Sequence, residues 1–274
     1  MLRGADAGVI ALRSSADAQQ AAFTGLTGWT AAEFSAYTAN LPRPYWTGFD
    51  TDVHIRHAEM ARRFRQLDEP LLIDFRQDPA RKVTELTVFS IDDAGLFSRI
   101  AGAVAGLGIN IAGARITTCL DGSVLDVFML QTSDNQIIAD EALLDRLGAS
   151  IASAANSTSR PQAALRERWQ SLPERVRHMP VPSRVMLSNK ISSTHTVVEV
   201  NGRDFPGLLF RITKALAELG LQIQTATVST YGERVVDVFY VKDLFGLQVH
   251  NEARLDVIRT RLLQVFDHVS EAAE

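Results

Sequence analysis

Residues 84–100 read TELTVFSIDDAGLFSRI, and residues 196–212 read TVVEVNGRDFPGLLFRI. Each stretch is a strand-like apolar run, then an acidic residue, then a Gly-Leu pair that opens an amphipathic helix. The two stretches lie 112 residues apart and align without a gap. The similarity extends to Asp126-Val127-Phe128 in one copy and Asp237-Val238-Phe239 in the other. A duplication of this length indicates that the chain holds two copies of one small domain.

The composition favours a soluble protein with more than one domain. The chain has 274 residues, of which 46% are hydrophobic and 22% charged, a mixture typical of globular proteins. Its net charge of −4 and lack of a dense Lys/Arg run argue against nucleic-acid binding. The single cysteine, Cys119, favours a reducing compartment, and no apolar run approaches the roughly 20 residues that span a membrane. We expect a cytoplasmic protein that contacts neither nucleic acid nor membrane.

Hydrophobic periodicity predicts the same order of elements in both copies: strand, strand, helix, strand, strand, helix. The first strands are predicted at 71–75 and 183–187, and the second strands are marked by alternation at Leu86 and Val88 and at Val198 and Val200. The later elements are predicted at 95–107, 109–118, 124–131 and 140–155, and at 207–219, 221–230, 235–242 and 252–265. This order predicts an α+β fold with the helices on one face of a sheet. A second copy of the sheet is the simplest cover for the other face. Alternatively, the two sheets join edge to edge, or pair with another chain.

The remaining segments are predicted to be connectors. Residues 1–69 are mostly helical, with a helix at His54–Leu67, and show no compact core, so we expect a connector that needs a neighbour. Residues 157–181 are polar and interrupted by prolines, which predicts a linker with a short helix near Gln162–Ser171. The two repeats then occupy residues 70–156 and 182–274.

The turn before the first helix of each repeat is the candidate binding site. Gly95 and Gly207 allow close approach of a ligand to the backbone, and the amides that follow lie at a helix N-terminus, which favours a carboxylate. Asp92 and Asp204 are placed to accept hydrogen bonds from an ammonium group. These groups together suit a free amino acid. The alternative is that both aspartates merely cap the helices, a far commoner role.

The candidate ligand-binding set comprises the turn, the first helical residues and the start of the next strand, where an amide side chain could recognise the ligand. These residues are Asp92, Asp93, Gly95, Leu96, Phe97, Asn110, Ile111, Asp204, Pro206, Gly207, Leu208, Leu209, Gln222 and Ile223. No catalytic or metal-binding set stands beside it. His54 and His57 share a helix face but lack an acidic partner at metal spacing, which favours a packing role. Asp126 and Asp237 are interpreted as cross-strand partners.

Several motifs resemble a known family. The pattern D-x-x-G-L-x-x-x-I, followed by GINIA or GLQIQ and then DVF, resembles the ACT domain, a regulatory amino-acid-binding module. PRPYWTGFDTDVHIRHAEM, NGRDFPGLLFRIT and STYGERVVDVFYV resemble the C-terminal tandem ACT region of bacterial PII uridylyltransferase/uridylyl-removing enzymes, over nearly all of residues 41–267. The resemblance implies two ferredoxin-like ACT domains (ββαββα) that sense L-glutamine. In that family they switch upstream catalytic domains between uridylylating and deuridylylating the PII protein.

The catalytic motifs of that family are not found in this sequence. Gly122-Ser123 is followed only by Leu125-Asp126-Val127 instead of an Asp-x-Asp metal pair, and no histidine precedes an aspartate as in the hydrolase domain. We therefore expect a regulatory region without catalytic residues or a cofactor, the Mg²⁺ belonging to the catalytic domains. Two alternatives stay open: an ACT pair that docks PII or the hydrolase domain, and a free-standing ACT-repeat sensor. Self-association through the sheets is possible, and the two turns should differ in affinity.

Overall fold

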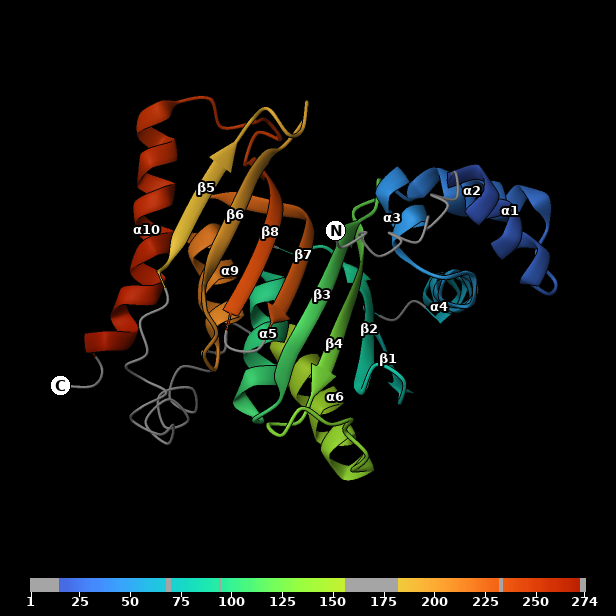
Figure 1. Ribbon diagram of the computed structural model, residues 1–274. Helices are drawn as coiled ribbons and strands as arrows, with labels where there is room; N and C mark the ends of the chain where they lie inside the picture. Colours follow the sequence, from blue (N-terminus) through green and yellow to red (C-terminus); the bar gives the residue numbers. More distant parts are fainter. Residues whose placement is uncertain (1–14, 68–69, 94, 156–181, 232–233, 272–274) are drawn as a thin grey trace, which may run out of the picture. The chain divides into compact units, whose positions relative to one another are not determined.

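The computed structural model describes residues 15–67, 70–93, 95–155, 182–231 and 234–271, and it has the predicted α+β fold (Figure 1). The first repeat comprises β1 Leu71–Asp78, β2 Val83–Ile91, α5 Leu96–Gly106, β3 Asn110–Thr118, β4 Ser123–Gln131 and α6 Glu141–Ala155. The second comprises β5 Arg184–Ser188, β6 Thr196–Arg203, α9 Leu208–Glu218, β7 Leu221–Tyr231, β8 Arg234–Asp243 and α10 Glu252–Glu271. The predicted order of elements is confirmed in both repeats. The predicted linker and its helix lie outside the described residues.

The eight strands form one sheet in the order β1-β2-β4-β3-β7-β8-β6-β5. The repeats therefore join edge to edge through β3 and β7, and the expectation that one sheet covers the face of the other is wrong. Pairing the two edges satisfies backbone groups that each repeat alone would leave unpaired. Among the strands that the structure describes, β1 and β5 are the two at the edges of the sheet.

A pseudo-two-fold relation links the two repeats. Helix α5 packs against α9, and the Ser98 hydroxyl donates a hydrogen bond of 3.4 Å to the carbonyl oxygen of Phe210. These residues occupy equivalent positions of the duplication, and equivalent positions meet on a two-fold axis. The strand junction is also tight, because a β-carbon on Gly113 would lie 3.1 Å from the carbonyl oxygen of Val228.

Two buried threonines at equivalent positions explain part of the repeated sequence. The Thr84 hydroxyl accepts a hydrogen bond of 2.9 Å from the backbone N–H of Ile138, and the Thr196 hydroxyl accepts one of 2.8 Å from that of Val249. Both threonines are fully buried. Each bond ties the extended segment after the fourth strand back to the second strand of the same repeat.

The residues before the first repeat form four helices: α1 Ser15–Gly25, α2 Ala31–Asn40, α3 Arg43–Gly48 and α4 Thr51–Leu67. These helices belong to one compact unit together with residues 70–72, 89–91 and 117–124. Trp46 is buried in this unit, with ring centroids 6.1 Å from Tyr37 and 4.9 Å from His54. The expectation that this segment has no core is therefore wrong. Its core combines single aromatic residues from several helices, which no one helical period reveals.

The two histidines of α4 have the packing role that the sequence predicts. His54 and His57 are both buried, and the Tyr45 hydroxyl lies 3.1 Å from Nδ1 of His57. Desolvation lowers the pKa of His57 to about 3, with smaller contributions from Arg56 and His54. His57 is therefore neutral at physiological pH. In the part of the chain that the structure describes, no helix is both long and apolar enough to cross a membrane.

Candidate functional site

The two turns have the same backbone geometry. Gly95 is the N-cap of α5 with φ 80° and ψ 8°, and Gly207 is the N-cap of α9 with φ 80° and ψ 11°. This left-handed conformation costs an L-residue roughly 1–2 kcal/mol, which explains the glycine in both copies. Neither helix has a side-chain cap. Asp92 and Asp204 therefore do not cap the helices, and the capping interpretation does not hold.

The helix N-termini offer fewer free amides than predicted. The N–H of Leu96 donates to the carbonyl of Asp93 at 2.9 Å, and that of Leu208 donates to the carbonyl of Phe205 at 3.0 Å. The predicted use of these two amides for a ligand is thus ruled out, because the turn already engages them. The amides of Phe97 and Leu209 have no acceptor among the described residues. They are the donors that a ligand carboxylate would meet.

The carboxylates of the turns differ in their surroundings. Asp93 forms an ion pair with Arg99, so its charge is already balanced. Asp92 and Asp204 instead each accept a hydrogen bond from the next backbone N–H. Partial burial, and then the charge of Asp93, raise the pKa of Asp92 above its usual value. Desolvation raises the pKa of Asp204 to about 6, although the residue still reaches solvent. Asp204 is therefore ionised at neutral pH and loses its charge just below it.

The amide side chains do not lie beside the turn of their own repeat. Asn110 begins β3 after the C-terminal end of α5, whereas the turn lies at the N-terminal end of this 11-residue helix, about 16 Å away. Strands β3 and β7 run in opposite directions (Figure 1). The start of β7, with Gln222 and Ile223, therefore lies at the same end of the sheet as the first turn. By the same relation, Asn110 and Ile111 lie at the end that carries the second turn.

Each turn therefore lies at the same end of the sheet as the strand start of the other repeat. The sequence alone grouped the residues within single repeats, because it contains no signal for the β3–β7 junction. The two amide positions also differ: Asn110 is half-buried and its Nδ2 donates to the carbonyl of Thr132 at 3.4 Å, whereas Gln222 is exposed.

One acidic residue near the second turn was not predicted as part of the site. Asp237 is buried on β8, and its register partner on β6 is Val200, so cross-strand charge pairing with β6 is not realised. Its Oδ1 accepts a hydrogen bond of 3.3 Å from the backbone N–H of Ser229. Desolvation raises the pKa of Asp237 to about 7, with a further increase from the charge of Asp204. The recurrence of DVF was the only sequence signal for this residue.

The described residues contain no group of three or more His, Cys, Asp or Glu side chains that could hold a metal ion. Cys119 is buried and forms no disulfide.

Comparison with known proteins gives a consistent result. Residues 191–266 match the family described as the ACR family N-terminal ACT domain. The chain is 44% identical to a bifunctional uridylyltransferase/uridylyl-removing enzyme of Rhodospirillum rubrum, over 86% of this chain and 25% of the relative. The enzymes of the same name from Azospirillum brasilense and Gluconobacter oxydans are 42% and 41% identical, each over 90% of this chain and 26% of the relative. The chain thus spans about a quarter of the length of these relatives. A solved structure from Galdieria sulphuraria aligns only weakly, with a TM-score of 0.23 and 14% identity over 69% of this chain and 94% of that chain.

Proposed function

We propose that the chain is a regulatory ACT region of the kind found in the bifunctional uridylyltransferase/uridylyl-removing enzymes that it resembles, and that it senses L-glutamine. The bound amino acid would then control uridylylation and deuridylylation of the PII nitrogen-signalling protein by the catalytic part of the enzyme. The region itself needs neither catalytic residues nor a cofactor for this role, and it acts in the cytoplasm.

The observation that carries the proposal is the pair of carboxylates that serve no cap. In each turn, an aspartate lies next to a left-handed glycine and a helix N-terminus with an open amide. The amide of Phe97 or Leu209 binds the α-carboxylate, and Asp92 or Asp204 binds the α-ammonium group. Gln222 or Asn110 of the other repeat then recognises the side-chain amide of glutamine, which has both a donor and an acceptor.

Calorimetric titration of the chain with L-glutamine tests this proposal, with Asp92→Asn and Asp204→Asn as the variants. Loss of a charge-assisted hydrogen bond should weaken the affected site by about 10- to 100-fold. Asp256→Asn, on the exposed surface of α10, is the matched control and should bind as the unchanged chain does. D-Glutamine and L-glutamate measure specificity. Absence of binding to the folded chain at millimolar L-glutamine would contradict the proposal.

A second candidate function, docking of the ACT pair onto PII or the hydrolase domain, is favoured by an exposed apolar turn. In the turn after β8, Leu244, Phe245 and Leu247 expose 67%, 86% and 62% of their surface. The turn does not need these side chains in order to fold. In this turn, the backbone N–H of Asp243 donates a hydrogen bond of 2.9 Å to the carbonyl of Leu247. In the equivalent turn after β4, the N–H of Thr132 donates one of the same length to the carbonyl of Gln136.

The residues that replace the apolar ones after β4 are polar: Ser133, Asp134 and Gln136. Exposed apolar side chains on an otherwise polar turn are typical of a protein-binding surface. Under this candidate function, Phe245→Asp abolishes binding of purified PII in biolayer interferometry, and the equivalent-position control Asp134→Ala does not. Binding must also survive Asp92→Asn and Asp204→Asn. Retained binding by Phe245→Asp would count against this surface.

A further inference from the structure

Three residues meet around the turn of each repeat: Asp93, Arg99 and Ala154 in the first, and Phe205, Arg211 and Phe266 in the second. The first two of each set are equivalent positions of the duplication, whereas Phe266 corresponds to Ala155, the residue after Ala154. In the first repeat, Arg99 forms an ion pair with Asp93, and its Nε donates a hydrogen bond of 2.9 Å to the carbonyl of Ala154. Ala154 lies in the last turn of α6. The Arg99 side chain therefore connects the turn to the end of the closing helix.

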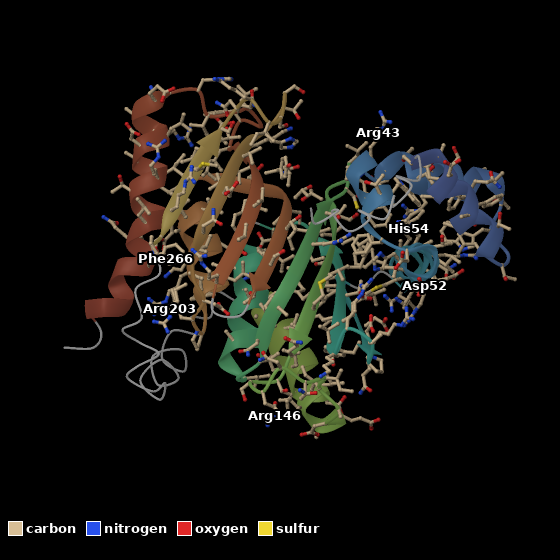
Figure 2. All side chains as sticks on the ribbon, in the orientation of Figure 1. Arg43, Asp52, His54, Arg146, Arg203 and Phe266 are labelled. Carbon is tan, nitrogen blue, oxygen red and sulfur yellow. The ribbon has the colours of Figure 1, made fainter. Side chains whose placement is uncertain are left out.

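In the second repeat, the turn and the closing helix meet through aromatic contacts. The Arg211 guanidinium lies 5.7 Å from the centroid of the Phe205 ring, and Phe205 meets Phe266 edge to face at 6.3 Å. Figure 2 shows Phe266 on α10, and Arg203 at the end of β6. The closing helix is again connected to the turn, but without an ion pair between the two positions.

A glycine makes room for this aromatic contact. A β-carbon on Gly202 would lie 2.3 Å from the Phe266 ring, so the ring in this position requires a residue without a side chain. The equivalent residues of the first repeat are Ser90 and Ala155. The side-chain volume thus changes together at two positions that lie far apart in the sequence, which indicates that each repeat has its own complete form of the contact.

We propose that these two sets of contacts are latches that hold the amino-acid-binding turn against the closing helix, with Arg99 as the positioning residue of the first and the Phe205–Phe266 pair making the connection in the second. The first latch is ionic and the second is aromatic. The role of the turn as a ligand site rests on the proposed function, but the latch itself does not. Arg99 also lies close to the turn backbone, since a β-carbon on Gly95 would be 3.6 Å from its Nη1. A ligand that moves the first turn must therefore move Arg99 and the end of α6.

The two latches should respond differently to salt. The Asp93 side chain is 67% exposed, so its attraction to Arg99 is screened as ionic strength rises. The aromatic contacts of the second latch include the apolar ring pair Phe205–Phe266, which salt does not weaken. Salt should thus loosen the first turn and leave the second unchanged.

Amide hydrogen exchange of the whole chain without ligand tests the latch. In Asp93→Asn, peptides that cover residues 92–98 and 150–155 should exchange faster, and 0.5 M NaCl should have the same effect on the unchanged chain. The peptides of the second repeat should not change. Asp256→Asn, which removes an exposed ion pair on α10, is the control. Unchanged exchange of both peptides in Asp93→Asn overturns the latch, whether or not the chain binds glutamine.

Titration with L-glutamine tests the link to ligand binding. Asp93→Asn should weaken binding at the first turn by about 2- to 5-fold at low salt, the range of a partly exposed ion pair, and remove its dependence on salt. The triple variant Asp93→Phe/Ser90→Gly/Ala155→Phe should restore tight binding without salt dependence, a rescue that a merely structural role would not produce. If the exchange results are as predicted but the chain does not bind L-glutamine, the proposed ligand is wrong and the proposed latch stands. Equal affinity and equal salt dependence of Asp93→Asn and the unchanged chain would refute the positioning role.

Discussion

Replacement of Asp237 by asparagine should stabilise the protein, and by an amount that depends on pH. The carboxyl is buried, and desolvation raises its pKa from 3.8 to about 7 in the folded state. Between these values the folded state holds more protons than the unfolded state, so stability falls as pH rises, by about 1.4 kcal/mol per pH unit. Above pH 7 the total penalty is about 4 kcal/mol. Asparagine removes it and keeps an oxygen for the N–H of Ser229.

Urea unfolding of Asp237→Asn and of the unchanged chain, at pH 4, 5.5, 7 and 8.5, measures this effect. The two free energies of unfolding should nearly agree at pH 4, diverge as pH rises, and differ by a constant amount above about pH 7. Asp256→Asn, where the carboxylate is exposed, should show no such divergence. A difference between Asp237→Asn and the unchanged chain that is the same at every pH would refute the reasoning, because an effect of packing does not titrate.

Three further predictions concern the junction, the turn and the helical unit. Gly113→Val should destabilise the β3–β7 junction by about 1–3 kcal/mol in thermal unfolding, because its side chain would meet the carbonyl of Val228; Gly106→Val, with open space around it, is the control for an added side chain. Gly207→Ala should cost about 1–2 kcal/mol, from its φ of 80°. The unchanged chain should lose stability by about 1.4 kcal/mol per pH unit as pH falls from 6.5 toward 3, because His57 stays neutral in the folded state. His57→Gln should lack this loss, which urea midpoints at pH 7.5 and 5 would reveal.

Local chemistry explains which parts of the site were predicted. The turns at Gly95 and Gly207 are predictable because a left-handed residue before a helix is usually glycine, which the sequence shows directly. The amides of Leu96 and Leu208 were predicted to be open donors, but each bonds to a carbonyl of its own turn. No residue type in the sequence signals that such a carbonyl folds back onto the helix. Asp93 was assigned to the ligand, and the structure pairs it with an arginine six residues later.

The errors beyond the site have a common origin in long-range packing. The aromatic core of the helical unit brings Tyr37, Trp46 and His54 together from three helices, and each helix contributes too few apolar residues to predict it alone. The burial of Asp237 depends on its neighbours Val200 and Ser229 on two other strands, which alternation along β8 cannot reveal.

The sequence by itself determined that the protein is a duplication, which elements each copy contains, in what order, and where each turn lies. It did so because periodicity, helix ends and left-handed glycines act over a few residues, and because the second copy repeats every one of those signals. Only the tertiary structure decided that the copies join through β3 and β7, and that each turn therefore lies at the same end of the sheet as the strand start of the other repeat. The edge of a strand offers the same backbone N–H and C=O groups whatever its side chains are, so the choice of partner edge depends on how whole repeats fit together.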